Sequence, residues 1–175
     1  HGQKTKRTAK ILTMEQNKAY FLEIEQYCES MCAQTSNIGT FVPLSDRDVQ
    51  NKVNGVNPGP YFILISYRGA LNENRQRTLS KKTLTFAILV KAPHDNASKQ
   101  HEAINRAEWI GLNIMAKIDL DSINGTPDWM KNAFLKDSVV YDEMQYENFP
   151  GLFGMEFSVD LNVKNTLKYN TEFWK

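Results

Sequence analysis

The stretch from Phe153 to Lys164 constrains the fold more than any other part of the chain. Apolar residues occupy every odd position from Phe153 to Val163, and Gly, polar or charged residues occupy every even position from Gly154 to Lys164. Side chains of a strand point alternately to its two faces, so this pattern predicts one long strand with an apolar and a polar face. Strands of parallel sheets read as continuous apolar runs, so the alternation favours antiparallel pairing. Other elements of the fold must therefore bury the apolar face of this strand.

Two segments with helical spacing of apolar residues can supply that cover. We predict one helix over Met14–Ala33 and a second over Ala97–Ile118, with Asp95 or Asn96 as the N-cap of the second. We expect the second helix to lie on the apolar face of the long strand, where Gly111 allows close approach. Its apolar face consists of Ala103, Ile104, Ala107, Ile110, Gly111, Ile114, Met115 and Ile118.

Further strands and a short helix complete the expected fold. Thr126 and Pro127 resemble a cap followed by a first-turn proline, which predicts a short helix through about Leu135. The order helix, strand, strand, helix, small helix, strand, strand predicts an α+β domain. We expect a mostly antiparallel sheet of about four to five strands, with two main helices packed on one face. The additional strands are predicted at Tyr61–Tyr67, Thr83–Lys91 and Val139–Tyr146.

The length of 175 residues fits a single domain with short extensions. We predict a basic flexible tail over 1–12, one α+β domain over 13–165, and an aromatic tail over 166–175. Within the domain, the proline in Phe41–Leu44 suits an edge or a loop, and Asp46–Val53 could form a short helix. The aromatic tail could dock on a partner or on the sheet edge. Its aromatic residues are Tyr169, Phe173 and Trp174.

Composition argues against several classes of function. A net charge of +1 excludes a strongly basic nucleic-acid binder on bulk charge. No apolar run approaches the ~20 residues that cross a bilayer. Cys28 and Cys32 are four residues apart on a predicted helix, a poor geometry for a disulfide, and we interpret them as small buried side chains. A metal site would need two more ligands, and His1, His94 and His101 lack a matching spacing.

Catalytic patterns are also weak, so the sequence predicts no enzyme, no cofactor, no metal and no catalytic residue. Asp119–Gly125 faintly resembles a calcium loop, but Ile123 and Asn124 stand where an oxygen ligand and glycine are required, so a helix end followed by a turn is favoured. An enzymatic interpretation would need scattered residues to converge in space, and nothing in the sequence predicts this. Those residues are His94, His101, Asp119 and Asp121.

The main charge cluster lies in Arg68–Lys82, between two predicted strands, where a single acidic residue, Glu73, accompanies the basic ones. The segment is too long for a tight turn, so we expect an extended hairpin arm or a mobile loop. Three interpretations remain open: a solvated loop, an arm that docks on a neighbouring subunit, or a nucleic-acid contact without the aromatic residues that stack bases. The basic residues are Arg68, Arg75, Arg77, Lys81 and Lys82.

The element order resembles that of the phage tail-terminator (tail-completion) proteins and the related minor tail and neck proteins of long-tailed phages. The turn Asn148–Gly154 is similar to the family's glycine-containing entry to its final strand. Residues 34–60 and the segment after Val163 are longer than in the family pattern. The matching stretches are Glu15–Met31, Tyr61–Tyr67 with Thr83–Lys91, Ala97–Ile118, and Val139–Tyr146 with Gly151–Val163.

The resemblance implies a structural virion protein without catalysis. It implies a homo-oligomeric ring, expected to be a hexamer, at the tail–neck junction, in contact with the tail tube and the head–tail connector. DNA would at most pass through the lumen, no membrane contact is expected, and assembly would take place in the cytoplasm of a bacterial host. The alternative is a monomeric or dimeric α+β binding module that holds a small ligand or an RNA in a pocket between sheet and helix.

Overall fold

The structure is a computed structural model that describes residues 17–44, 52–53, 58–74, 77–145, 151–165, 169, 171 and 173–174, except the side chains of 72–74, 77, 78 and 145. The predicted tail over 1–12 therefore lies outside the described residues, as does Asp46–Val53 apart from Lys52 and Val53. The elements are α1 (Phe21–Ala33), β1 (Thr40–Val42), β2 (Tyr61–Asn74), β3 (Arg77–Lys91), α3 (Ala97–Asn124), η1 (Asp128–Met130), β4 (Phe134–Gln145) and β5 (Leu152–Lys164).

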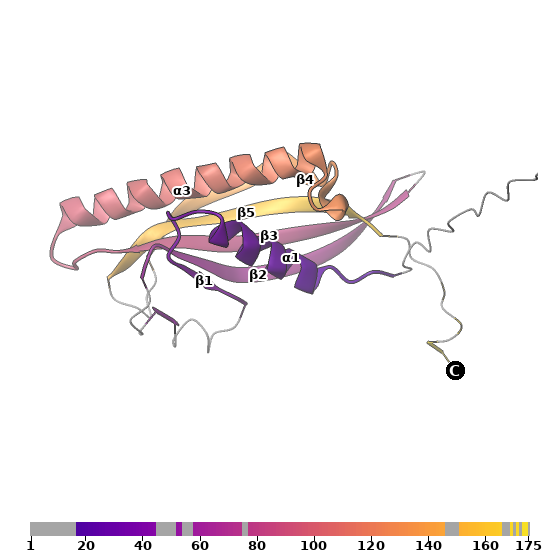
Figure 1. Cartoon of the computed structure of the whole chain (residues 1–175), viewed down its shortest axis with the longest axis horizontal. Helices are drawn as coiled ribbons and strands as arrows, with labels where there is room; N and C mark the ends of the chain where they lie inside the picture. The colour runs from indigo at the N-terminus through magenta and orange to yellow at the C-terminus, as the bar shows by residue number, and fades with distance from the viewer. Residues whose placement is uncertain are drawn as a thin grey trace, which may run out of the picture.

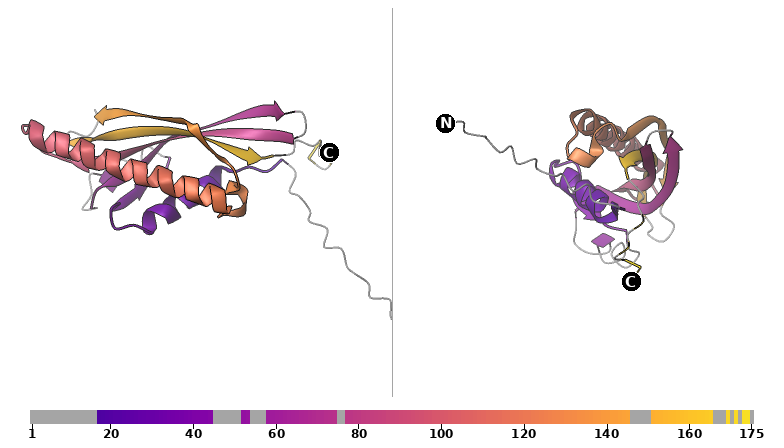
Figure 2. Two further views of the ribbon diagram at one scale, coloured as in Figure 1. Left: turned by 90° about the horizontal axis from the view of Figure 1, so that it is seen from above. Right: turned by 90° about the vertical axis from the view of Figure 1, so that its right-hand side faces the viewer.

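The strands form a five-stranded sheet in the order β1-β2-β3-β5-β4. β1 pairs with β2 in parallel, and every other neighbouring pair is antiparallel. Figure 1 shows α3 lying along the length of the sheet with the shorter α1 beside it, and Figure 2 shows the sheet curving around the two helices. The α+β class, the mostly antiparallel sheet and the packing of both helices on one face are confirmed.

β5 is the long strand that the alternating pattern predicts. Its odd-numbered side chains from Phe153 to Val163 are buried, and most of them join the core under the helices. Phe157 is fully buried in a row of stacked rings: its centroid lies 5.5 Å from that of Phe86 on β3 and 5.3 Å from that of Tyr141 on β4. Phe62 on β2 continues the row, 4.5 Å from Phe86. These flat rings link four strands beneath the helices.

α3 covers the apolar face of β5 as expected. The side chain of Asn96 accepts a hydrogen bond from the backbone N–H of Lys99, which confirms the predicted N-cap. A Cβ added at Gly111 would lie 2.0 Å from Cζ of Phe157, so the helix approaches the strand at a distance that only glycine permits. The helix extends past Ile118 to Asn124 and ends at Gly125, whose φ of 71° is left-handed.

α1 begins at Phe21, so the prediction of a helix from Met14 is wrong for residues 17–20; Met14 itself lies outside the described residues. Asn17 has a φ of 56°, which is incompatible with a continuous helix. The hydroxyl of Tyr20 donates to the carbonyl oxygen of Lys164 at 2.6 Å. This contact with the end of β5 fixes the chain just before the helix.

The segment between α3 and β4 differs from the prediction. The only helix there, within the described residues, is the 3-10 turn η1, which has no side-chain cap, and β4 begins at Phe134 rather than Val139. The backbone N–H groups of Asn132 and Phe134 donate to Ser122 at the end of α3. The N–H of Asn162 on β5 donates to the carbonyl oxygen of Ala133, so the chain already joins the sheet just before Phe134. Tertiary hydrogen bonds therefore replace a helix through Leu135.

The other face of the sheet has a second, smaller apolar cluster at one end. β1 lies at the sheet edge, which confirms the edge interpretation of Phe41–Leu44. Val53 is buried in this cluster, on the face that α1 and α3 do not cover. The sheet is therefore covered on both faces at the end where β2 begins. The buried members of the cluster are Val42, Val53, Tyr61, Ile63, Ala87, Leu89 and Leu152.

Candidate functional site

The most prominent open features of the molecule are the two edges of its sheet. β1 pairs with β2 only over Tyr61–Ile63, so among the described residues no strand pairs with the outer edge of β2 from Leu64 to Asn74. β4 is the last strand on the opposite side, and the described chain adds no strand beyond it. Unpaired N–H and C=O groups at such edges can pair with another strand.

The two edges differ in charge but both contain exposed apolar side chains. On β4, Asp137, Asp142 and Glu143 are exposed, beside Val140, which is 66% exposed. On β2, Arg68 is exposed and Leu71 is 56% exposed. The β4 edge is therefore net acidic, since exposed Lys136 offsets only one of its three carboxylates, whereas the open edge of β2 has Arg68 as the one charged side chain that the structure describes; Glu73 lies on the same strand, and its side chain is not described. Arg68 on one edge and the net acidic charge on the other permit complementary contact between copies in the same orientation.

The predicted basic arm is a regular part of the hairpin formed by β2 and β3. The two strands pair from Tyr61↔Leu89 to Asn74↔Arg77, so an extended hairpin is correct and a loop is wrong for the described residues. Arg75 lies outside the described residues, and the side chain of Arg77 is also not described.

The basic side chains of the hairpin that the structure describes, Arg68, Lys81 and Lys82, do not form one patch. Strand alternation places Arg68 and Lys81 on the polar face and Lys82 on the helix-covered face. Nζ of Lys82 lies 5.6 Å from the centroid of the Tyr67 ring. Nζ of Lys81 forms an ion pair of 3.0 Å with Asp160 on β5. The period-2 geometry therefore divides a cluster that is continuous in sequence.

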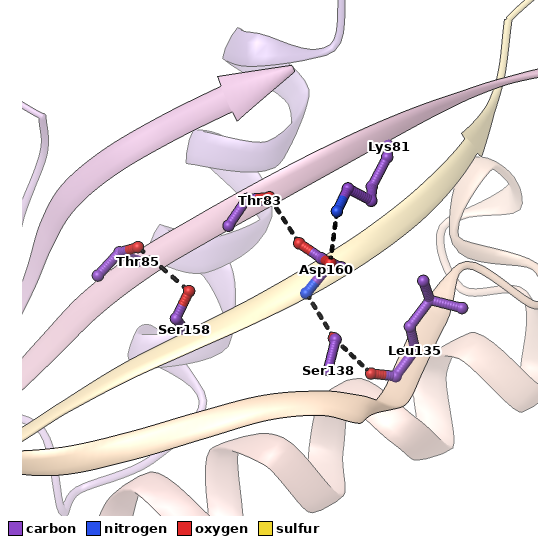
Figure 3. A network of polar contacts seen from close by, with 7 residues as sticks. All are labelled: Lys81, Thr83, Thr85, Leu135, Ser138, Ser158 and Asp160. Carbon is purple, nitrogen blue, oxygen red and sulfur yellow. Dashed lines mark hydrogen bonds and ion pairs between the residues drawn. The ribbon is translucent and has the colours of Figure 1, made fainter. Parts of the chain in front are cut away.

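Asp160 is the centre of a hydrogen-bond network on the polar face (Figure 3). One carboxylate oxygen accepts from the hydroxyl of Thr83 at 2.5 Å, and the other accepts from Lys81. The backbone N–H of Asp160 donates to Oγ of Ser138, which itself donates to the carbonyl oxygen of Leu135 at 2.6 Å. Ser138 occupies the register shift between Leu135 and Val140 on β4. The network thus fixes the edge strand β4 to β5 and β3.

The aromatic tail is exposed. Tyr169, Phe173 and Trp174 are 75%, 75% and 68% exposed, so none of them is packed against the sheet edge. The rings of Phe173 and Trp174 pack edge to face with centroids 5.3 Å apart. Docking on a partner stays a prediction for these side chains.

A cavity of about 280 Å³ opens between the end of α1, the segment after it, and the middle of α3. Its floor is apolar and its rim has amide groups, the amine of Lys117 and the indole of Trp109, which is 54% exposed. The cavity lies between two helices, not between sheet and helix as the binding-module interpretation expects. The apolar floor is formed by Met31, Ile38, Ile110 and Ile114, and the amides on the rim are those of Gln34, Asn37 and Asn113.

A partly buried polar cluster, which includes Lys117 of the cavity rim, joins the two helices. The hydroxyl of Tyr27 donates to Oδ2 of Asp121 at 2.9 Å, and Nζ of Lys117 contacts Oδ1 at 2.6 Å. Asp121 is 5% exposed, so these two donors compensate the burial of its carboxylate. Burial, followed by the hydrogen bond to Asp121, raises the pKa of Tyr27 well above its ordinary value. The cluster is therefore a structural contact in which Tyr27 remains protonated.

The cysteines are free and buried in the core, which agrees with their interpretation as small buried side chains. Burial is the main cause that raises both pKa values, and the negative charge of Glu29 adds to it for Cys32. The pKa of Cys32 rises to about 12, and that of Cys28 rises further. Neither thiol is activated as a nucleophile, because nucleophilic attack requires the thiolate.

The histidine and aspartate residues considered for catalysis do not converge. His101 and Asp119 both lie on α3, and a helix rises 1.5 Å per residue, so they are separated by about 27 Å along its axis. His94 packs against Phe153, and Asp121 is occupied by Tyr27 and Lys117.

Asp119–Gly125 forms the end of α3 and its cap, as the preferred interpretation predicts. Among the described residues, His, Cys, Asp and Glu form no group of three placed to hold a metal ion. No helix in the described part of the chain is long and apolar enough to span a membrane.

Sequence reasoning missed three features of these surfaces. The sheet edges depend on strand order, which no local pattern reveals. The cavity depends on the position of the segment after α1. A third feature was visible in the sequence: α3 has a second apolar stripe opposite its buried face, formed by Trp109, Leu112, Ala116, Leu120 and Ile123.

Comparison with known proteins adds no relative: no protein-family model matches the chain, and no curated protein is significantly similar to it.

Proposed function

We propose that the protein is a structural virion subunit that forms a closed ring at the tail–neck junction of a long-tailed phage, as a tail terminator or a related neck component, without catalysis. The observation that carries the proposal is the pair of open sheet edges with opposite charge. The β4 edge is net acidic through Asp142 and Glu143, and the open edge of β2 has Arg68 as its one charged side chain among those that the structure describes.

Two different complementary surfaces on one subunit produce a head-to-tail contact. Such a contact is heterologous, and it closes into a ring when the rotation between neighbours permits. In the proposed ring, β4 of one subunit lies against β2 of the next, so that main-chain groups at both edges find partners. Val140 on the polar face and Leu71 on the helix-covered face would each be partly covered by the neighbouring strand, and Arg68 and Asp142, both on the polar face, would set the orientation.

The layout of the chain also supports the proposal. It contains a helix before a long hairpin, a covering helix, and a closing pair of strands, in the order of the tail-terminator proteins. The β2–β3 hairpin is the extended arm expected over Arg68–Lys82, which could reach a neighbouring subunit. In the assembled tail the ring would contact the tail tube and the connector, with DNA at most passing through its lumen.

The ring is tested by light scattering after size exclusion over a concentration series, with negative-stain images of the main peak. We expect a closed ring of about six subunits. Asp142→Lys should weaken assembly, as should Arg68→Glu or the pair Arg75→Glu and Arg77→Glu, while the monomer remains folded by circular dichroism.

A swapped-charge variant sharpens this test. Arg68→Glu combined with Asp142→Lys in one chain should recover assembly, because opposite charges face each other again. Asp95→Lys, an exposed charge reversal away from both edges, is the matched control and should leave assembly unchanged. Wild-type mass in all edge variants would rule out contact through these edges.

The cavity favours the alternative function, a monomeric or dimeric module that binds a small ligand. Its size is close to the lower end of small-molecule pockets, and its apolar floor with a polar rim has their typical character. The anionic dye 1-anilinonaphthalene-8-sulfonate suits this site, since its aromatic body fits the apolar floor and its sulfonate can accept hydrogen bonds from the amide groups of the rim. Saturable binding that Trp109→Ala abolishes, together with a stable monomer at all concentrations, would favour the binding module over the ring.

A further inference from the structure

The outward side of α3 has an apolar stripe that nothing in the described part of the molecule covers. Single exposed apolar residues are ordinary on protein surfaces, but a continuous row along one helix indicates a contact surface. Ala116 is exposed at the centre of this row. The large members are Trp109, Leu112, Leu120 and Ile123, which are 54%, 44%, 52% and 60% exposed.

The spacing of the stripe matches a helical partner. Successive members from Trp109 to Ile123 are separated by 3, 4, 4 and 3 residues, an average of 3.5, which is the repeat of a helix that packs along another helix. At 100° per residue the row lies opposite the buried face that contains Ala107, Gly111 and Ile118. α3 is therefore apolar on two opposite sides, and only one of them is buried within the chain.

The charges that flank the stripe indicate what the partner is. Arg106 and Lys117 lie along one side of the row, and Glu108 and Asp119 lie along the other side at nearly the same heights. Within the chain, Lys117 is already paired with Asp121 and Asp119 with Lys136, so Arg106 and Glu108 are the charges on which a partner would act most strongly. A partner helix that complements this surface needs acidic residues beside the first pair and basic residues beside the second. The same helix of a second copy has this pattern.

We propose that the outward stripe of α3 is a self-association surface that pairs in parallel with the same stripe of a second copy across a two-fold axis. In a parallel pair, each flank of one helix meets the opposite flank of the other. Arg106 then faces the acidic side of the partner near Glu108, while Lys117 and Asp119 lie at matching heights and keep their partners Asp121 and Lys136 within the chain. An antiparallel pair centred on the stripe would place like charges together, since Lys117 would face its own copy.

The seam is short, and this determines its strength. From Trp109 to Ile123 it spans about 21 Å of helix, which is less than a standard stable interface requires. We therefore expect dissociation constants in the micromolar range or weaker. The contact is isologous and uses neither sheet edge, so it is independent of the proposed ring: it would pair two monomers or, because every subunit of a ring has its own stripe, join rings to one another.

The first experiment compares the mass of the wild type with that of Leu120→Glu by sedimentation velocity over a concentration series. The wild type should reach twice the mass of the variant at high concentration, and the variant should weaken self-association at least tenfold. The factor of two applies to a monomer, and rings, with one stripe per subunit, should reach at least twice the mass of the variant. Because the variant reports the mass of the basic unit by itself, failure of the ring and failure of the stripe are distinguishable. Leu22→Glu on α1 is the matched control, because Leu22 is 64% exposed and lies away from the stripe.

Equal masses for the wild type and Leu120→Glu at all concentrations would overturn the proposal. The same holds if Leu22→Glu and Leu120→Glu reduce association equally, since the effect would then belong to added charge and not to the stripe.

The second experiment determines the orientation of the pair by disulfide cross-linking. In a parallel pair each stripe position lies near its own copy, so Trp109→Cys and Ile123→Cys should each form a homodimeric disulfide under mild oxidation. Native Cys28 and Cys32 are buried, so the wild type should give no cross-link. A disulfide that forms only when the two variants are mixed would show an antiparallel pair and overturn the parallel arrangement. No cross-link in any combination would overturn the contact itself.

Discussion

The two faces of β5 are stabilised by different physical interactions. On one face, Phe157 is fully buried between the rings of Phe86 and Tyr141 and beneath Gly111 of α3. On the other face, Asp160 is held by directional bonds from Thr83 and Lys81 in a half-open environment. Packing depends on volume and tolerates little change, whereas a partly hydrated polar network can exchange some of its bonds for water. The apolar face should therefore dominate stability, and the polar face should determine alignment.

The largest effect is expected on the apolar face. Phe157→Ala removes the central ring of the row and should lower the free energy of unfolding by about 3–5 kcal/mol. Urea denaturation followed by circular dichroism measures this loss. Phe157→Leu, which keeps most of the volume, should cost clearly less. A loss below that of Asp160→Ala would reverse the expected order of the two faces.

A smaller effect is expected on the polar face. Asp160→Ala leaves Thr83 and Lys81 without their shared acceptor and should cost about 1–2 kcal/mol, because the side chain of Asp160 is 18% exposed and water replaces part of the interaction. Asp160→Asn keeps an acceptor for Thr83 and should cost less. Urea denaturation at low and high salt separates the two contributions, since salt screens only the ion pair with Lys81. A cost of Asp160→Asn equal to that of Asp160→Ala would show that the charge is the essential feature.

The smallest effect is expected from ionisation of the Cys32 thiol, which is buried in the core on the apolar side of the sheet. The pKa of Cys32 is about 12 in the folded protein, against an ordinary value of 9.0. A raised pKa means that the unfolded chain loses this proton first, so the contribution is fully present below pH 9 and is lost progressively from pH 9 to pH 12. Ionisation of Cys32 in the unfolded chain should therefore make the free energy of unfolding about 1 kcal/mol lower at pH 10 than below pH 9.

Cys32→Ala should make the decline in stability between pH 8 and pH 10 less steep than in the wild type. Thiol labelling at pH 8 provides a second measurement: neither cysteine should react in the native protein, and both should react in urea. Rapid labelling of native Cys32 would contradict its burial.

The faces of the long elements could be predicted because a residue's position in a regular period determines its direction. This is why the apolar positions of β5 and the buried stripe of α3 were correct, and why Gly111 was correctly expected at a close approach. The same rule, applied to the basic hairpin, would have shown that Lys81 and Lys82 point to opposite faces. The division of that cluster was therefore predictable from sequence.

Boundaries set by distant contacts could not be predicted. The start of α1 depends on the bond from Tyr20 to Lys164, and the start of β4 depends on bonds to Ser122 and Ala133. The register shift at Ser138 similarly depends on its bonds to β5 and to Leu135. The candidate edges belong to this class too, because the position of β5 between β3 and β4 is a property of the whole sheet.

The uneven length of the strands has a consequence for growth by edge pairing. One row across the sheet contains residues of all five strands, from Val42 through Ile63, Ala87 and Glu156 to Asp142. Near the hairpin tip, the row of Leu71, Ser80 and Val163 has only three members among the described residues.

The sheet thus narrows by two strands, or about 10 Å, from one end to the other. Copies of such a trapezoid, joined edge to edge in one orientation, each turn in the same sense relative to the last. Their shape alone therefore opposes a straight ribbon and directs growth along an arc.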